Sequence, residues 1–242
     1  MNILLTNDDG YDSKGIHLLK DKLKKYGRVI IVAPKGPMSA KSVSITIGTG
    51  IRVEKVDDDT FICEGTPADC VSFGCNALSI DFDLVVSGCN NGFNVSYDTM
   101  YSGTVGAALE ALTYGKKSIA VSCPYGNGDN FVIVDKYFEQ VFEYVLNKNL
   151  LSKEYLLNVN FPYGEEVKDI KISTLYYKVN QYDYFFTREE DGYHAYRELK
   201  TDFSDDKNSD CYLINNGIVS ITPLNKSYFS KEIYEKLKER QI

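Results

Sequence analysis

Short apolar runs alternate with segments of helical periodicity up to residue 160, and this alternation constrains the fold more than any other feature. The apolar runs, each the length of one buried strand, lie at residues 3–6, 29–33, 83–87, 118–122 and 156–160. Helical spacing of apolar residues extends over three segments, which are 16–26, 104–114 and 135–145. We expect Asp135 to cap the third helix. Continuous apolar runs are typical of buried parallel strands, and strands that alternate with helices form parallel sheets. We therefore expect an α/β fold with a Rossmann-like, doubly wound and mostly parallel sheet.

The pattern changes after Pro162. Residues 171–200 are rich in Tyr, Phe and Thr, and Asp191-Gly192 lies between two such runs. This arrangement predicts a β-hairpin with its turn at that dipeptide. The acidic segment 202–210 that follows is expected to be a mobile loop.

The end of the chain closes the fold. Residues 218–221 form a further apolar run, and Ile233 and Leu237 mark a closing helix. We expect one domain over residues 1–242, with a core of about 1–170 and 211–225, a hairpin excursion of about 171–210 and a C-terminal helix of about 228–240.

The charge balance excludes one class of partner. The net charge is −7 and no basic stripe occurs, whereas a nucleic-acid polymer requires clustered Lys and Arg. A small phosphorylated substrate is compatible with this balance, because one cation and a few oriented amides can hold a single phosphate.

Cysteine usage and hydropathy indicate the compartment. The six cysteines include no CxxC pair and most lie in apolar runs, so we expect reduced, buried thiols. No apolar run approaches membrane-spanning length, and the polar residues after Leu5 leave no signal-peptide core. We expect a cytoplasmic protein with no membrane partner.

Two adjacent carboxylates, Asp8 and Asp9, follow directly on the first predicted strand. Ligands of open α/β sheets bind outside the carboxyl ends of the strands. Paired carboxylates are ionised at neutral pH and repel each other, so a hard cation is their natural ligand. The alternative is a solvated Asp-Asp-Gly turn.

Three further segments also follow predicted strands. Residues 33–44 form a hydroxyl-rich loop, and residues 87–94 combine glycines with amide side chains that can bind a hard cation. Ser102, Gly103 and Thr104 open a helix whose free N–H groups suit an anion, although simple N-capping would also explain Ser102 and Thr104. Because all these segments follow strands, we expect them to meet at one edge of the sheet.

At this point the chain resembles the survival protein SurE family. Six blocks in family order carry the resemblance: Asn7 to Gly10, the Ala33-Pro34 loop with Ser39, Gly65 to Cys70, Ser87 to Asn94, Tyr101 to Val105, and Val219 to Leu224. The loop before Ser39 differs, since members commonly read Asp-Arg-Asn-Arg-Ser-Gly where this chain has residues 35–40, Lys-Gly-Pro-Met-Ser-Ala.

The resemblance implies a metal-dependent 5′/3′-nucleotidase. It implies one divalent metal ion per subunit, Mg²⁺ or Mn²⁺, with the ligands Asp8, Asp9, Ser39 and Asn90. It also implies that substrate phosphate is bound by Asn94, Ser102, Gly103 and Thr104. The expected reaction is hydrolysis of nucleoside 5′-monophosphates to nucleoside and phosphate, with 3′-monophosphates and short polyphosphate as further candidate substrates.

The catalytic residues expected from the sequence are Asp8 and Asp9. Either carboxylate could act as general base toward water, and direct attack by an aspartate to form a phosphoenzyme is the alternative. His17 falls in an amphipathic helix and His194 in the hairpin, so both are assigned to structure.

Two rival functions fit parts of this pattern. A receiver-like signalling domain that binds metal and phosphate would also place paired acids after its first strand, but it requires an aspartate at the end of the third strand, where this chain has Ser87 to Asn90. A nicotinamide oxidoreductase requires a glycine fingerprint that opens a helix, and Gly48-Thr49-Gly50 opens none.

The predicted hairpin is also unusually aromatic, with Tyr176, Tyr177, Tyr182, Tyr184, Phe185, Phe186, Tyr193 and Tyr196. A lone hairpin is marginally stable, and large exposed apolar patches mark contacts. We expect a homodimer or homotetramer in which the hairpin builds the interface, as the family resemblance also implies. The alternative is that these aromatics pack on their own domain.

Overall fold

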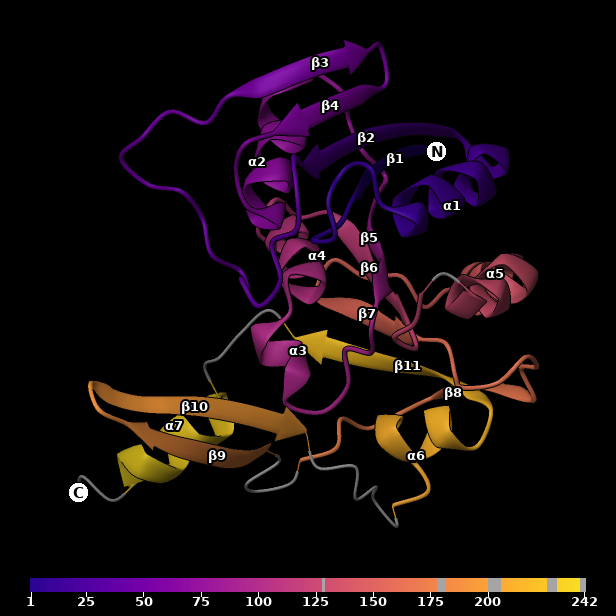
Figure 1. The fold of residues 1–242 in the computed structure, drawn as a ribbon. Helices are drawn as coiled ribbons and strands as arrows, with labels where there is room; N and C mark the ends of the chain where they lie inside the picture. The colour runs from indigo at the N-terminus through magenta and orange to yellow at the C-terminus, as the bar shows by residue number, and fades with distance from the viewer. Residues whose placement is uncertain (128, 178–181, 200–205, 226–229, 240–242) are drawn as a thin grey trace.

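The computed structural model describes residues 1–127, 129–177, 182–199, 206–225 and 230–239 (Figure 1). A nine-stranded sheet forms its centre, in the order β3-β4-β2-β1-β5-β6-β7-β11-β8. The bounds of these strands are β1 Asn2–Thr6, β2 Arg28–Pro34, β3 Val53–Asp57, β4 Thr60–Cys63, β5 Leu84–Asn91, β6 Lys117–Cys123, β7 Tyr155–Asn160, β8 Asp169–Ile172 and β11 Ile218–Asn225. Among the described strands of this sheet, only β3 with β4 and β7 with β11 pair antiparallel, so the prediction of a mostly parallel sheet is confirmed.

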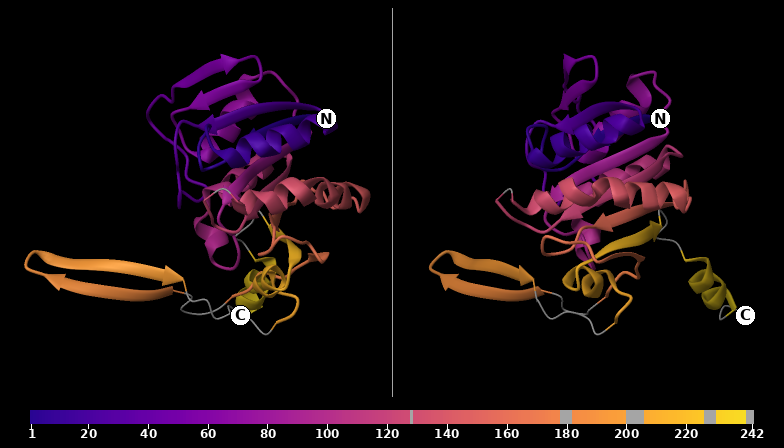
Figure 2. Two further views of the ribbon diagram at one scale, coloured as in Figure 1. Left: turned by 45° about the vertical axis from the view of Figure 1, so that its right-hand side comes forward. Right: turned by 90° about the vertical axis from the view of Figure 1, so that its right-hand side faces the viewer.

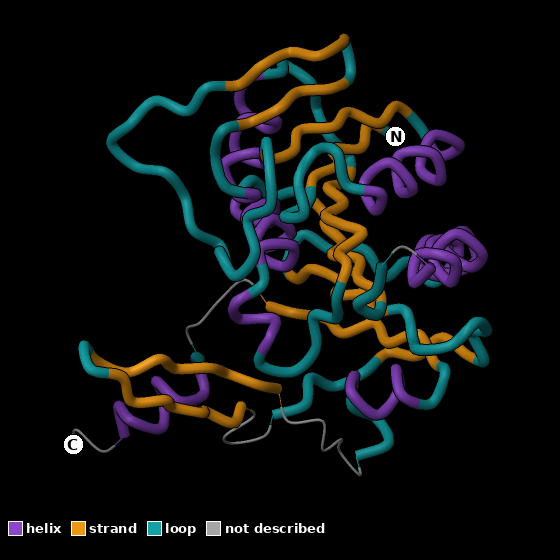
Figure 3. The backbone as a smooth tube through the Cα atoms, viewed as in Figure 1, coloured by secondary structure: helices purple, strands orange, loops and turns teal. Residues whose placement is uncertain are grey.

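Helices cover both faces of the sheet (Figures 1 and 3). Alternate side chains of each strand point to opposite faces. Thus Leu5 packs in the cluster that includes the buried residues of α1 (Lys14–Leu23) and α5 (Val132–Asn147). Its neighbour Leu4 packs in the cluster with residues of α2 (Pro67–Ala77) and α4 (Gly103–Thr113). This two-sided burial explains why the strands read as continuous apolar runs.

The predicted hairpin exists but turns one residue earlier than expected. Strands β9 (Tyr182–Glu189) and β10 (Gly192–Leu199) pair only with each other. Gly192 pairs with Glu189 in the ladder, so the two-residue turn is Glu190-Asp191 rather than Asp191-Gly192. The hairpin projects away from the central sheet (Figure 2).

The start of α5 differs from the expectation for Asp135. A short 3-10 turn, Asp129–Phe131, leads directly into the helix, whose N-cap is Phe131. Asp135 therefore lies inside the first turn of the helix, where its carboxylate pairs with Lys22 at 2.7 Å.

The segment expected to be a mobile loop contains a buried residue. Asp210 is fully buried at the start of α6 (Asp210–Asn215), and its carboxylate accepts the backbone N–H groups of Ser96 at 2.8 Å and Tyr176 at 3.0 Å. These donors compensate the buried charge, which explains why an acidic residue can lie there. Residues 202–205 of the same segment lie outside the described residues.

Three smaller helices complete the chain. A single 3-10 turn, Lys24–Tyr26, extends α1, and α3 (Asp98–Tyr101) precedes α4. The closing helix is α7 (Lys231–Lys238), within the predicted range. Within the described ranges no helix is both long and apolar enough to span a bilayer. All six cysteines are free thiols, and only Cys75 is not fully buried.

Candidate active site

One cavity of about 330 Å³ brings most of the predicted site residues together. It lies where β1 and β5 end, at the carboxyl edge of the parallel strands, as expected for an open α/β sheet. Its walls are formed by Asp8, Asp9, Ser39, Ala40, Asn90, Asn91, Phe93, Asn94, Asp98, Tyr101 and Ser102. Gly103 and Thr104, the remaining predicted residues, lie behind Asp8 rather than on the cavity wall.

The loop that carries the two aspartates is shaped by Asn7. The Asn7 side-chain amide donates to the carbonyl of Gly10 at 2.9 Å and to the hydroxyl of Ser13 at 2.7 Å, and its Oδ1 accepts the N–H of Gly10 at 3.2 Å. The Met38 N–H donates to the carbonyl of Asp8 at 2.7 Å, which ties this loop to the loop that carries Ser39. The side-chain hydrogen bonds of Asn7 and the backbone hydrogen bond from Met38 therefore hold the Asp8 loop in place.

Asp8 is buried, and its carboxylate accepts a short hydrogen bond from the Thr104 hydroxyl. Gly103 makes this approach feasible, because a Cβ atom there would lie 2.8 Å from the Cβ of Asp8. Burial raises the pKa of Asp8 from 3.8 to about 6, with a further rise from the charge of Asp9 and an opposing effect of the Thr104 hydrogen bond. A carboxylate in this position therefore gains from any cation that compensates its charge.

Asp9 is half-buried and accepts the backbone N–H of Asn91 at 3.0 Å. Burial raises its pKa, and the Asn91 N–H opposes the shift. The neighbouring Asn90 uses its amide nitrogen to donate to the Gly92 carbonyl at 2.8 Å, which leaves its Oδ1 as the atom available to a cation.

The end of β5 is bent to present these two asparagines. Its pairing with β6 is irregular between Ser87 and Asn90. Gly88 allows the two strands to approach there, because a Cβ atom would lie 2.3 Å from the carbonyl oxygen of Val121. Any other residue would push β5 away from β6 and displace Asn90 and Asn91.

The long loop that carries Ser39 is fastened at two points. The backbone N–H of Ser42 donates to the Tyr101 carbonyl at 2.8 Å, and the Ser42 hydroxyl donates to the Met100 carbonyl at 2.8 Å. Farther along, the Thr46 hydroxyl donates to the carboxylate of Asp69 at 2.6 Å. Ser39 itself is exposed at the cavity wall.

Asn94 and Ser102 have distinct local roles. The Asn94 side chain donates to the hydroxyl of Ser122 at 2.8 Å, and its N–H donates to the side chain of Asn160 at 2.9 Å. Ser102 caps α4, since its hydroxyl oxygen accepts the N–H of Val105 at 3.1 Å. The hydroxyl proton of Ser102 is not used in that bond and can be donated to a ligand.

The donor atoms fit a hard divalent cation. Two buried or half-buried carboxylates, an amide oxygen and a hydroxyl meet at one cavity, and Mg²⁺ and Mn²⁺ prefer such oxygen ligands. Over the described part of the chain no group of three or more His, Cys, Asp or Glu side chains could hold a metal ion. A cation at this site would therefore depend on Asn90 and Ser39 as well as on the two aspartates.

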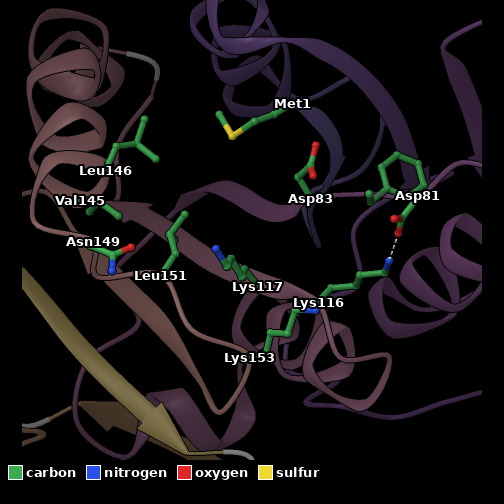
Figure 4. A pocket seen from close by; sticks show the side chains of 11 residues that line it. Met1, Asp81, Asp83, Lys116, Lys117, Val145, Leu146, Asn149, Leu151 and Lys153 are labelled. Atoms are coloured by element: carbon green, nitrogen blue, oxygen red, sulfur yellow. Dashed lines mark hydrogen bonds and ion pairs between the residues drawn. The ribbon is translucent and has the colours of Figure 1, made fainter.

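A separate cavity of about 520 Å³ lies at the opposite edge of the sheet (Figure 4). It is lined by Met1, by Asp83 before β5 and by Lys117 at the start of β6, with Lys116 paired to Asp81 at 2.5 Å. None of the predicted site residues lines it. The amino-terminal edge of the strands is thus distinct from the edge that carries Asp8 and Asp9.

Comparison with known proteins identifies the family. Residues 3–181 match the family model described as survival protein SurE. This chain belongs to the SurE family. The family resemblance read from the sequence motifs is therefore confirmed.

Similar SurE proteins share nearly the whole chain. The 5′-nucleotidase SurE of Clostridium botulinum strain ATCC 19397 is 37% identical over 250 aligned residues, which cover 99% of this chain and 98% of the relative. The corresponding protein of strain Alaska E43 is 36% identical, with 97% of this chain and 98% of the relative covered. The crystal structure of the SurE protein from Aquifex aeolicus matches with a TM-score of 0.88 at 33% identity, covering 100% of both chains.

Several residues of this SurE site were not anticipated from the sequence. Asn91 binds Asp9 through its N–H, and Asp98 and Tyr101 line the cavity. Thr104 was expected to contact phosphate, but its hydroxyl donates to Asp8, 96 residues away in sequence. Asp98 lies between the Ser87 to Asn94 block and the Tyr101 to Val105 block, and this position is the one sequence signal that could have marked it.

Proposed function

We propose that this protein is a phosphomonoesterase that hydrolyses nucleoside 5′-monophosphates to nucleoside and phosphate with one divalent cation, Mg²⁺ or Mn²⁺, per subunit. One observation carries the proposal: two adjacent carboxylates, Asp8 and Asp9, line a cavity at the carboxyl edge of the sheet in a chain whose relatives are named 5′-nucleotidases. The receiver-like alternative finds no support, since β5 ends in Asn90-Asn91 and not in an aspartate.

The cation ligands in this proposal are the carboxylates of Asp8 and Asp9, the Oδ1 of Asn90 and the hydroxyl of Ser39. When bound, the cation would neutralise charge on the phosphate and acidify a water molecule. Asn7, Asn91 and Thr104 act as positioning residues, because their hydrogen bonds fix the aspartate loop, Asp9 and Asp8, respectively.

The phosphate group is proposed to contact Asn94, Ser102 and the start of α4. Ser102 can donate its hydroxyl proton to a phosphate oxygen, and the free N–H groups of the first turn suit an anion. Gly103 and Thr104 support this contact through their packing against Asp8.

The two aspartates are also the proposed catalytic carboxylates. A general base must lie within hydrogen-bond reach of the proton that it accepts, and both carboxylates lie on the wall of the cavity proposed to hold the substrate. Asp8 or Asp9 would accept a proton from the attacking water, with formation of an aspartyl phosphate as the alternative mechanism.

Further parts of the proposal concern range and setting. Hydrolysis of 3′-monophosphates and short polyphosphate is proposed as a secondary activity of the same site. A single domain over residues 1–242 and a cytoplasmic location are also proposed; the six free cysteines support a reducing compartment.

Assembly as a homodimer or homotetramer is proposed through the hairpin. Its aromatic side chains are exposed in the single chain, with Phe186 at 65% and Tyr193 at 69% of their full accessible area. Exposed aromatic groups at this density are stabilised by a partner surface.

The function is tested by incubating the purified protein with nucleoside 5′- and 3′-monophosphates, an aryl phosphate and polyphosphate, each with Mg²⁺, Mn²⁺ or a chelator. Phosphate release from 5′-monophosphates that depends on the cation is expected. Asp8→Asn and Asp9→Asn should each remove most of that release while the far-UV circular dichroism spectrum is unchanged. Cation-dependent turnover near the wild-type rate in either variant would contradict the assignment.

A further inference from the structure

A third carboxyl group, that of Asp98, lines the candidate active site. Asp98 begins α3 and lies half-buried on the wall of the same cavity as Asp8 and Asp9. Its N–H donates to the Val95 carbonyl at 3.1 Å, and its carbonyl accepts the N–H of Ser102 at 3.0 Å. The backbone of Asp98 is therefore fixed relative to Ser102, a residue proposed to hold the phosphate.

No positive side chain compensates this carboxyl group. Within the part of the chain that the structure describes, Asp98 forms neither an ion pair nor a side-chain hydrogen bond, and its charged neighbour is the buried carboxyl group of Asp210. Burial, and then the negative charge of Asp210, raise the pKa of Asp98 to about 6.

The two carboxyl groups differ in what surrounds them. Burial raises the pKa of Asp210 as well, but the backbone N–H groups of Ser96, Tyr176 and Cys211 donate to its carboxylate. Donors of this kind stabilise the ionised form. Asp98 has no such donors, so burial and the negative charge of Asp210 favour its protonated form.

Hydrolysis of a nucleotide requires a proton for the departing alcohol, since an alkoxide is a poor leaving group. Asp8, Asp9 and Tyr101 are the other titratable groups on the cavity wall, and the two aspartates are already assigned to the cation and the attacking water. Neither His17 nor His194 lines the cavity. Asp98 is thus the carboxyl group left to perform this step.

We propose that Asp98 is the general acid that protonates the departing nucleoside oxygen, an inference that rests on the proposed function. As the bond between phosphorus and the ribose oxygen breaks, its electron pair stays on that oxygen, which takes the carboxylic proton of Asp98. The nucleoside leaves as a neutral alcohol and Asp98 becomes a carboxylate. The attacking water gives its oxygen and one hydrogen to phosphorus and its other proton to Asp8 or Asp9. That carboxyl group then releases the proton to solvent, and solvent returns a proton to Asp98, so charge and atoms balance over the cycle.

Leaving groups of different basicity test this proposal. Asp98→Asn is compared with wild type on a nucleoside 5′-monophosphate, whose alkoxide needs a proton, and on 4-nitrophenyl phosphate, whose phenolate does not. We expect kcat on the nucleotide to fall by about 10² to 10⁴-fold, the usual contribution of a general acid, and kcat on the aryl ester to be little changed. Asp12→Asn is the matched control. It removes an exposed carboxylate that lies close in sequence to Asp8 and Asp9 but not on the cavity wall, and it should leave both rates unchanged.

The outcomes separate this inference from the proposed function. An equal loss of kcat on both substrates, or no loss on the nucleotide, overturns the role of Asp98 while the nucleotidase proposal stands. A wild-type protein that hydrolyses neither substrate with any divalent cation overturns both.

The pH dependence of wild-type kcat provides a second measurement that needs no variant. The groups near Asp98 are Asp210 and Cys211 on α6, Tyr101 on the same helix α3, and Asp8 and Asp9 on the wall of the same cavity. Ionisation of Asp98 should lower kcat at high pH on the nucleotide but not on 4-nitrophenyl phosphate. The same basic limb on both substrates, or on neither, contradicts the proposal even when Asp98→Asn fails to fold.

Discussion

Replacement of Gly103 by alanine tests whether close packing at the start of α4 positions Asp8. The added Cβ would lie 2.8 Å from the Cβ of Asp8 and 3.0 Å from its Oδ2. Unstrained carbon–carbon contacts lie at about 3.5–4.0 Å, so Asp8 or the helix must move by roughly 1 Å. A displacement of about 1 Å at a reacting group can lower the rate by about 100-fold. Stability should fall by no more than about 1–3 kcal/mol, because the cost of the added contact is partly offset by the preference for alanine over glycine in a helix.

The assay for Gly103→Ala is kcat on a nucleoside 5′-monophosphate together with a thermal melt. Gly36→Ala is the matched control, because Gly36 lies in the neighbouring Ser39 loop and an added Cβ there meets no atom within 4 Å. We expect a large loss of turnover in Gly103→Ala and no loss in Gly36→Ala, with both variants folded at the assay temperature. Wild-type turnover in Gly103→Ala would refute the inference that this contact positions Asp8.

Three other predictions follow from burial and charge. Because the folded-state pKa of Asp8 is raised from 3.8 to about 6, the cation-free protein should lose stability as pH rises from about 4 to about 6. In urea with a chelator at pH 7, Asp8→Asn should therefore be more stable than wild type by about 2–3 kcal/mol, and equal or lower stability would contradict the charge argument. Phe161→Ala, which empties a fully buried site, should lower the free energy of unfolding by about 3–5 kcal/mol in the same titration. Replacing both Phe186 and Tyr193 by serine should shift sedimentation toward monomers; a wild-type monomer at micromolar concentration would refute the hairpin interface.

The buried part of the fold could be predicted because its strands are apolar on both faces. Leu4 and Leu5 pack in different clusters, so every residue of such a strand is constrained to be hydrophobic. The edge hairpin of β3 and β4 was missed for the opposite reason. Most of β3 is exposed, and its sequence Val53-Glu54-Lys55-Val56-Asp57 contains no apolar run.

Helix α2 was missed although its sequence carried a signal. Thr66 and Asp69 form a capping box and Pro67 occupies the first helical turn, which together mark a helix start. The same residues belong to the family block Gly65 to Cys70, from which no helix was predicted. Asp69 also binds Thr46, a contact over 23 residues that no local pattern encodes.

The site was predictable only as a set of loops that share one edge of the sheet. Strand order and parallel pairing bring Asp8, Asn90 and Ser102 to one cavity. The alternation of strands and helices in the sequence predicts this parallel arrangement. Contacts between particular atoms were not predictable, because they depend on how helices and loops pack. The Thr104 hydroxyl on Asp8 and the proximity of Asp98 to Asp210 are of this kind.

Phosphate release from a nucleoside 5′-monophosphate, measured in chelator and again after Mn²⁺ is added, tests the central claim most directly. The claim is that Asp8 and Asp9 hold a cation that nucleotide hydrolysis requires. Wild-type protein should be inactive in chelator and active after Mn²⁺ is added, while Asp8→Asn stays inactive in both conditions. Release that continues in chelator at the rate seen with Mn²⁺ would contradict the claim.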